Sequence, residues 1–318
     1  MLVYAGEALA EYGFGHGHPF GPDRFFAFWQ EFKASGLDSV TTIHQPVSAT
    51  REDLLLFHDQ YYVERVARLS QEGFGMLDAD TPVFPGVYEA ALTVVGSVLD
   101  GVKQIMNGTT RSVFVPIAGL HHAHRGHSAG FCVFNDCGIA IEALRARHGV
   151  SRVAYVDIDA HHGDGVFYEF ESDPDLIFAD FHEDGRYLYP GTGRIDETGK
   201  GKAAGHKLNL PLPPGATNEL FLQLWPKVES FLEKFRPEFI ILQCGADSLA
   251  GDPLTHLALS DSAHGYAAER LFTCLGEWDA KGLLALGGGG YNRDNLARAW
   301  NRVVATIAKL ERGGGATQ

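Results

Sequence analysis

The sequence has few cysteines and no long apolar run, and these shortages narrow the classes of protein that it can encode. Only four cysteines occur in 318 residues, and no two of them form a C-x-x-C pair. We therefore expect buried, reduced thiols and a cytoplasmic protein. No apolar stretch approaches the roughly 18 residues that span a bilayer, and the chain does not open on a signal-peptide pattern. No membrane partner is expected.

Positive charge is also scarce. Lysine and arginine number 26 against 40 acidic residues, which gives a net charge of −14. Phosphate binding needs a basic surface, so this charge argues against nucleic acid as a partner. It is compatible with cationic substrates or partners.

Neither an internal repeat nor a linker divides the chain. We expect one domain over residues 1–312 and a disordered tail over residues 313–318. Short apolar runs alternate with helical segments such as Asn218–Phe235 and Ser262–Trp278, which predicts an α/β fold. Runs that are apolar on both faces, such as VAYVDI and FIILQC, suit a mainly parallel sheet covered by helices on both sides. The predicted strands are Asp38–His44, Ser112–Ala118, Arg152–Asp159, Leu176–His182, Lys207–Pro211, Phe239–Cys244 and Gly282–Leu286.

Metal-ligand side chains follow two of these strands. In an extended chain Asp157, Asp159 and His161 point to the same side, and two carboxylates with an imidazole make half of a divalent-metal site. Asp247 follows another buried run and is a natural further ligand. Because ligands bind at the carboxyl ends of parallel strands, these clusters can converge. Two aspartates and one histidine leave a coordination position open, as a catalytic zinc site requires.

A histidine pair and a glycine run follow two further strands. His121 and His122 can supply a general base and a second imidazole that tunes it, with Asp157 and Asp164 as partners that orient each ring. Residues 287–290 are all glycine, without the Lys-Ser/Thr of a phosphate-binding loop. Tyr291, which follows them, can donate its hydroxyl to a developing oxyanion. His16 and His18 in GHGHP form a possible metal pair, but a loop role is favoured.

Several motifs together resemble the histone deacetylase superfamily, most closely its class I and bacterial acetoin-utilisation branch. The motifs are HPFGPDR, DTPVFPGVYEAAL, HHAHRGHSAGFCVFNDCGIAI, VAYVDIDAHHGDGV, YPGTG, LPLPPG, GADSLAGDPL and LGGGGYN, and they cover nearly the whole chain in the family's order. The resemblance implies a single-domain arginase-like fold with an open parallel sheet of about eight strands. It implies Zn²⁺, or Fe²⁺ in some settings, on Asp159, His161 and Asp247.

The resemblance also implies a role for each site residue. His122 is similar to the general base and acid, His121 to its electrostatic partner, Asp157 and Asp164 to their orienters, and Tyr291 to the carbonyl-polarising donor. The implied substrate channel and rim consist of Asp80, Gly130, Phe131, Tyr189 and Leu254, and Arg24 is similar to the arginine of an acetate-exit cavity. The family usually has phenylalanine where this chain has Tyr189.

A monovalent cation, usually K⁺, accompanies the metal in the family. The resemblance places it at carbonyls around Asp157, Asp159, His161 and Phe181, with a serine hydroxyl where this chain has Asp180. That departure means that Asp180 either binds the cation more strongly or belongs to a different local packing.

The predicted activity is therefore metal-dependent hydrolysis of an acetylated amine, with Nε-acetyl-lysine in a peptide or protein as the favoured substrate. An acetylpolyamine or another small acyl-amine is the alternative. Relatives selective for acetylpolyamines carry a glutamate seven residues after the metal-binding aspartate, and here that position is Leu254. A di-manganese ureohydrolase also uses a D-A-H-x-D element, but GADSLAGDP lacks the cluster for its second ion. A non-catalytic binding module is disfavoured because every catalytic position is filled.

Overall fold

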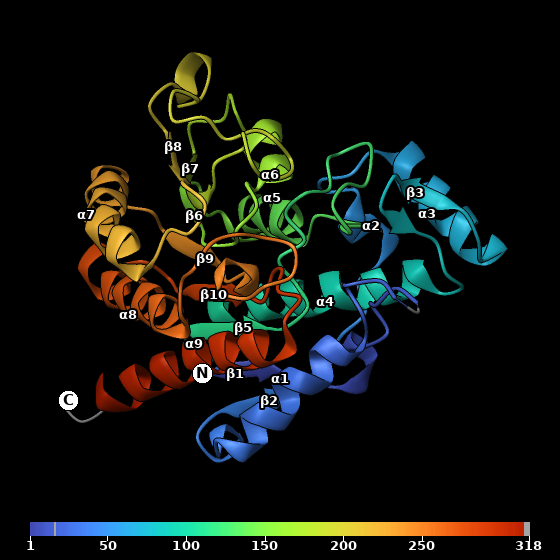
Figure 1. The fold of residues 1–318 in the computed structure, drawn as a ribbon, viewed down its shortest axis with the longest axis horizontal. Helices are drawn as coiled ribbons and strands as arrows, with labels where there is room; N and C mark the ends of the chain where they lie inside the picture. The colour runs from blue at the N-terminus through green and yellow to red at the C-terminus, as the bar shows by residue number, and fades with distance from the viewer. Residues whose placement is uncertain (16, 315–318) are drawn as a thin grey trace.

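The computed structural model of the protein describes residues 1–15 and 17–314 and is built around one parallel sheet (Figure 1). Its eight strands lie in the order β2-β1-β5-β10-β9-β6-β7-β8. The strands are β1 (Leu2–Tyr4), β2 (Thr42–His44), β5 (Ser112–Val115), β6 (Val153–Asp157), β7 (Leu176–Glu183), β8 (Lys207–Leu212), β9 (Phe239–Gln243) and β10 (Leu283–Leu286). A separate antiparallel ribbon consists of β3 (Met76–Asp78) and β4 (Thr81–Pro82).

Helices cover both faces of the sheet. They are α1 (Asp23–Ala34), α2 (Arg51–Leu54), α3 (Gln60–Glu72), α4 (Val87–Met106), α5 (Asp136–His148), α6 (Asp164–Glu169), α7 (Asn218–Phe235), α8 (Asp261–Trp278) and α9 (Arg293–Gly314). The neighbours Val113 and Phe114 of β5 show the two faces, because adjacent strand residues point to opposite sides. Val113 lies against Gly101 of α4, whereas Phe114 packs on α9 through Trp300.

The predicted α/β class, the parallel sheet and the two helical layers are confirmed. Helix α7 has the predicted bounds, and α8 begins one residue earlier than predicted. The first predicted strand, Asp38–His44, is only partly a strand, since a 3-10 turn occupies Leu37–Ser39 and only Thr42–His44 pairs in the sheet. The strand Leu2–Tyr4 was not predicted, because three residues are too short to show a period.

The register of the central strands brings their carboxyl ends together. Leu286 of β10 pairs with Val115 of β5 on one side and with Gln243 of β9 on the other. Asp157 of β6 pairs with Gln243 and with Asp180. The segments that follow β5, β10, β9 and β6 therefore leave the sheet at one edge, and these segments carry the predicted site residues.

Three further predictions concern the C-terminal tail, His16 and the cysteines. Helix α9 includes residues 313 and 314, which the sequence analysis assigned to the tail, and residues 315–318 lie outside the described part of the chain. His16 also lies outside it. All four cysteines are free and buried, as expected. None of the helices that the structure describes combines the length and apolar character needed to cross a bilayer.

Candidate active site

Three predicted metal ligands meet at the carboxyl edge of the sheet. Asp159, His161 and Asp247 are buried, and one ligand atom from each lies within 4.8 Å of the other two. The Nδ1 atom of His161 is 3.0 Å from Oδ1 of Asp159 and 3.2 Å from Oδ2 of Asp247. In the part of the chain that the structure describes, these three side chains bring their ligand atoms close enough together to hold one metal ion.

The other oxygens of the two carboxylates are held by protein donors. Oδ2 of Asp159 accepts from Nε2 of Gln243 at 2.8 Å and from the backbone N–H of Gly289 at 2.9 Å. Oδ1 of Asp247 accepts from the backbone N–H of Ala160 at 2.9 Å. A Cβ at Gly289 would lie 2.1 Å from Oδ2 of Asp247, so this approach requires glycine. These donors leave Oδ1 of Asp159 and Oδ2 of Asp247 beside Nδ1 of His161, where the three atoms can share one ion.

The charges at this point fit a divalent cation. Burial and the neighbouring Asp159 raise the pKa of Asp247 to about 7. Burial opposes the charge on His161, but Asp159 and Asp247 outweigh it and hold the pKa of His161 well above its usual value. Two buried carboxylates and an imidazole need a cation among them, and two oxygens with one nitrogen are ligands that zinc accepts.

Metal affinity should therefore rise steeply with pH. Below pH 7 the metal must displace a proton from the Asp247 carboxyl and another from His161, because both groups hold protons in the metal-free site. Each displaced proton changes the affinity about 10-fold per pH unit. We expect the zinc Kd, measured against a competing chelator, to fall by about 10- to 100-fold between pH 6 and pH 7. A Kd that does not change over that interval would contradict this assignment of the ligands.

The histidine pair lies beside the metal group. Nδ1 of His122 is 2.6 Å from Oδ1 of Asp164, and Nδ1 of His121 is 2.7 Å from Oδ2 of Asp157. The two Nε2 atoms lie 3.1 Å apart. The ring of His122 is 5.7 Å from that of His161, which places the pair next to the metal ligands. The predicted partners are thus the observed ones.

The environments of the two histidines assign them different roles. Burial disfavours the charged form of His121, but Asp157 and Asp159 outweigh it and raise the pKa of His121 to about 10. Burial and the positive His121 lower the pKa of His122, against the opposing effect of Asp164. His122 is therefore the neutral ring that can accept a proton, and His121 is a fixed cation beside it.

Tyr291 and Arg24 lie close to each other, with the Arg24 guanidinium 5.7 Å from the centre of the Tyr291 ring. The backbone N–H of Tyr291 donates to Oδ2 of Asp252 at 2.7 Å. Burial and the Asp247 carboxylate hold the pKa of Tyr291 well above its usual value, so its hydroxyl remains a neutral donor. Arg24 is fully buried and donates to the carbonyls of Gly288 and Gly290, while its Nη1 has no partner among the described residues. That free donor suits a small anion such as acetate.

Three of the predicted channel residues, Gly130, Phe131 and Tyr189, contact the histidine pair or Tyr291. Tyr189 lies 5.3 Å from the ring of His122, and Phe131 lies 5.8 Å from the ring of Tyr291. Gly130 has a φ of +52°, and a Cβ there would lie 2.5 Å from the His122 ring. Asp80 joins the strands of the β3–β4 ribbon, and Leu254 is 37% exposed.

The side chain of Asp180, at the expected potassium site, is held by groups of the protein. Its Oδ2 accepts from the backbone N–H of Gly163 at 2.9 Å, and its Oδ1 lies 2.7 Å from Nδ1 of His182. Nε2 of His182 lies 2.8 Å from the Gly193 carbonyl, which can only accept, so both ring nitrogens carry protons. Burial opposes this charge, but Asp180 raises the pKa of His182. A buried ion pair of the protein thus engages the Asp180 side chain, which favours the second of the two expectations, a different local packing. The carbonyls of the expected potassium site stay a prediction.

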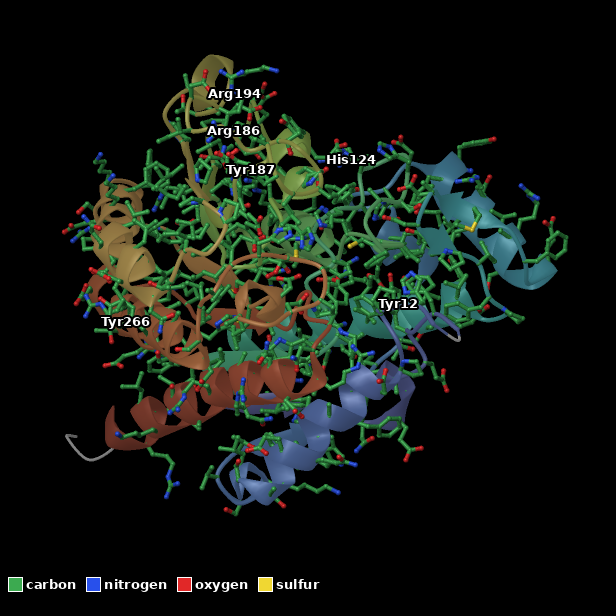
Figure 2. The ribbon with its side chains drawn as sticks, in the orientation of Figure 1. Tyr12, His124, Arg186, Tyr187, Arg194 and Tyr266 are labelled. Carbon is green, nitrogen blue, oxygen red and sulfur yellow. The ribbon has the colours of Figure 1, made fainter. Side chains whose placement is uncertain are left out.

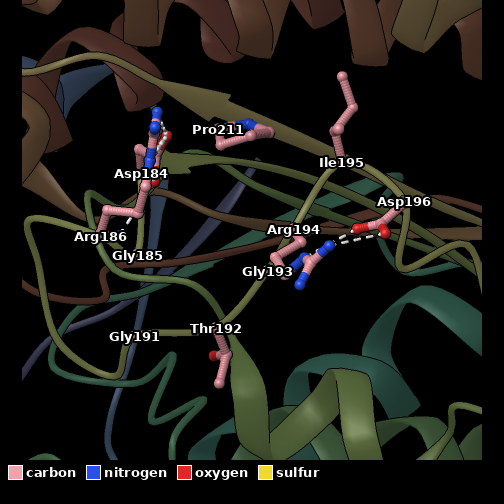
Figure 3. Close-up of a pocket in the computed structure, with 10 residues that line it drawn as sticks. All are labelled: Asp184, Gly185, Arg186, Gly191, Thr192, Gly193, Arg194, Ile195, Asp196 and Pro211. Carbon is pink, nitrogen blue, oxygen red and sulfur yellow. Dashed lines mark hydrogen bonds and ion pairs between the residues drawn. The ribbon is translucent and has the colours of Figure 1, made fainter.

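A surface pocket of about 570 Å³ lies in the loop that carries Tyr189, but no predicted site residue lines it (Figure 3). Both arginines of this pocket are labelled in the upper part of Figure 2. Each is already neutralised, because Arg186 pairs with Asp184 at 2.6 Å and Arg194 pairs with Asp196 at 2.9 Å. The pocket therefore offers no free charge for an anionic ligand.

Two residues with clear contacts in the site received no role from the sequence. Gln243 holds Asp159, and its signal was a polar residue at the end of the apolar run FIILQ. Asp252 accepts from the backbone N–H groups of Tyr291 and Leu254, and nothing in its local sequence indicates these contacts.

Comparisons with known proteins identify the family of this chain. The histone deacetylase domain matches residues 18–307. The acetoin utilization protein AcuC of Bacillus subtilis is 35% identical and covers 98% of this chain and 83% of its own length. Histone deacetylase 8 of Xenopus tropicalis is 33% identical, with 86% of this chain and 75% of its own length covered.

A further relative and a solved structure indicate the same family. Histone deacetylase clr6 of Schizosaccharomyces pombe is 33% identical over 96% of this chain and 76% of its own length. The crystal structure of the HDA15 HD domain superposes with a TM-score of 0.88 at 25% identity, covering 97% of this chain and 89% of that one. The chain therefore belongs to the histone deacetylase family and is a deacetylase-type hydrolase.

Proposed function

We propose that this protein is a zinc-dependent deacetylase that hydrolyses Nε-acetyl-lysine in peptides or proteins to free amine and acetate. The observation that carries the proposal is His122, paired with Asp164 at 2.6 Å, beside the ligand group of Asp159, His161 and Asp247. A base next to an open metal site is the arrangement that hydrolysis by water needs.

Each side chain has a step in this reaction. The bound ion would polarise the acetyl carbonyl and lower the pKa of the attacking water. His122 takes the proton from that water as the water attacks the carbonyl carbon, while Asp164 holds the ring. The Tyr291 hydroxyl donates to the oxyanion that develops. His122 then gives its proton to the amine nitrogen as the C–N bond breaks, which leaves free amine and acetate.

The test is turnover of a fluorogenic acetyl-lysine peptide with and without chelator. We expect activity that a chelator abolishes and zinc restores. A preparation that stays fully active without metal, or that never turns over with zinc or Fe²⁺, would refute the proposal. Two metal ions per chain would favour the di-manganese ureohydrolase, and bound peptide without turnover would favour a binding module.

The Tyr291 hydroxyl should matter for the chemical step and not for binding. Tyr291→Phe removes one oxyanion donor, and such a loss typically lowers kcat by about 10²–10³-fold. Metal content and peptide affinity should stay unchanged, because the tyrosine backbone remains held by Asp252. Steady-state kinetics and metal analysis measure both. A variant with near-normal kcat would remove Tyr291 from the mechanism.

Two rim residues favour a peptide over a polyamine. Leu254 is partly exposed and offers no charge for a second ammonium group, but it suits the apolar stem of lysine. The Asp80 carboxylate can accept hydrogen bonds from the backbone amides of a peptide, which a polyamine lacks. The net charge of −14 attracts any cation, but salt screens so diffuse a charge over about 8 Å.

Leu254→Glu should shift the specificity. We expect the wild type to prefer an acetyl-lysine peptide over N8-acetylspermidine in kcat/KM. The variant should move towards the polyamine by about 10-fold, for about 1.4 kcal/mol of charge pairing. Leu254→Gln is the matched control, because it has the same length without the charge. A wild type that prefers the polyamine would show that the specificity lies elsewhere in the rim.

A further inference from the structure

His18 of the GHGHP segment supplies no ligand to the metal group, yet it contacts two separate parts of the channel. Its Nε2 atom lies 3.2 Å from the backbone carbonyl of Asp80 at the rim. Its ring packs edge-on against the ring of Phe131, the channel wall, at 4.6 Å and 77°. Phe14 packs against His18 at 4.6 Å and is itself buried, so the imidazole is backed by the core.

The hydrogen bonds of His18 determine its tautomer. The backbone N–H of Phe20 donates to Nδ1 at 3.1 Å, so Nδ1 carries no proton. In a neutral ring the proton is then on Nε2, which donates to the Asp80 carbonyl. Both nitrogens are used, and the ring has one orientation that satisfies them. His18 therefore connects the segment before α1, through Phe20, to the rim residue Asp80 in one fixed orientation.

Phe131 needs support from outside its own loop. Its φ of +67° lies in the left-handed region, which residues other than glycine occupy only when their surroundings hold them there. The Phe131 carbonyl accepts from the hydroxyl of Tyr12 at 2.8 Å, and its N–H donates to Oγ1 of Thr81 at 3.2 Å. Tyr12 belongs to the N-terminal segment that lies beside α4 and the start of α1 (Figure 2).

Two residues, Thr81 and His18, thus each connect Asp80 at the rim to Phe131 of the channel wall. Thr81 accepts from Phe131 and donates to the Asp80 carboxylate at 3.1 Å, while His18 holds the Asp80 carbonyl and the Phe131 ring. We propose that His18 is a positioning residue for substrate specificity, which fixes the rim carboxylate relative to the channel wall. A peptide is then read at both places together, by its backbone at Asp80 and by its lysine stem at Phe131. This inference rests on the proposed deacetylase function.

The effect should be on binding and not on chemistry. None of the contacts of His18 given above involves the metal ligands or the histidine pair. The backbone of Tyr291 is held independently by Asp252. A loosened rim therefore lowers the affinity for a substrate that uses Asp80, and it leaves the reacting groups in place.

The experiment compares two substrates in zinc-loaded full-length protein. One is an acetyl-lysine peptide, and the other is N-pentylacetamide, which has the acylated stem without a backbone. We expect His18→Ala to raise the KM of the peptide about 10-fold relative to that of N-pentylacetamide, with kcat changed by less than about 3-fold. A purely structural defect would change both substrates alike.

Two further variants separate the contacts of His18. His18→Gln can still donate to the Asp80 carbonyl and accept from Phe20, so it should restore most of the peptide preference. His18→Phe keeps a ring against Phe131 but cannot hydrogen-bond, so it should not restore it. His127→Ala is the control. It also removes an imidazole, but His127 is exposed and stacks on His124 at 4.5 Å and not on Phe131.

The Asp80→Ala background completes the test. Once the rim carboxylate is absent, His18→Ala should no longer change the ratio of the two KM values, because the two residues act as one unit. If wild type turns over the peptide but His18→Ala behaves like His127→Ala, the inference is wrong and the proposed function stands. If wild type shows no turnover, the proposed function itself fails. If His18→Ala does not fold, the contrast between His18→Gln and His18→Phe decides.

Discussion

Asp247→Ala should lose the bound metal and the activity together. The variant removes one of three ligands and leaves Asp159 and His161, which are too few to hold the ion against a chelator. We expect metal content to fall from about one ion per chain to near zero by elemental analysis. Turnover of the acetyl-lysine peptide should fall at least about 10⁴-fold, since enzymes exceed uncatalysed rates by about 10⁶-fold or more.

A stability measurement on a second variant, Asp247→Asn, separates the loss of a ligand from unfolding of the protein. The folded pKa of Asp247, about 7, lies above its unfolded value near 3.8, so its contribution to stability is present below 3.8 and lost as pH rises through 7. Metal-free wild type at pH 8 therefore carries an unfavourable buried charge, which Asp247→Asn removes. We expect the metal-free Asn variant to unfold at a higher temperature than metal-free wild type at pH 8.

Asp196→Ala is the control for the two Asp247 variants, because it removes an exposed aspartate whose partner is Arg194 and not a metal ligand. It should keep both metal and activity. If Asp247→Ala retained stoichiometric metal, the ligand would have to be assigned to another residue.

The fold and the meeting of the three candidate metal ligands were predictable because both depend on local pattern. Apolar runs such as VAYVD are buried on both faces, and the polar residues that end them are placed by the sheet register. Asp159 and Asp247 follow two such runs, so knowledge of parallel sheets was enough to bring them together. The pairing of His122 with Asp164 came from their chemistry.

The remaining features depend on contacts between distant segments. His18 contacts Asp80 and Phe131, which lie more than sixty and one hundred residues away in the sequence. For Asp180 the sequence left open whether it binds a cation or belongs to a different local packing. The choice depends on the proton of His182 and on the Gly193 carbonyl, which only the folded loop brings together. No period or motif in the sequence reports such contacts.

The histidine pair gives the second large effect. His122→Ala should lower kcat by about 10²–10⁴-fold, as the loss of a general acid–base group does. His121→Ala should cost less, about 10- to 100-fold, because His121 acts on the base and not on the substrate. Both variants should keep their metal, which elemental analysis checks. If His121→Ala were the more damaging variant, the two roles would have to be exchanged.

The pH dependence of kcat/KM separates the two roles more sharply than the rates do. His121 is a cation at neutral pH and lowers the pKa of His122, whereas Asp164 raises it. Removing the cation in His121→Ala should therefore raise the pKa of His122, so that the acidic limb of the profile moves to higher pH. Removing the negative charge in Asp164→Asn should move the same limb to lower pH. The variants remove groups on opposite sides of one imidazole, at 3.1 and 2.6 Å, and the predicted shifts have opposite signs. If the acidic limb moved in the same direction in both variants, it would report a group other than His122.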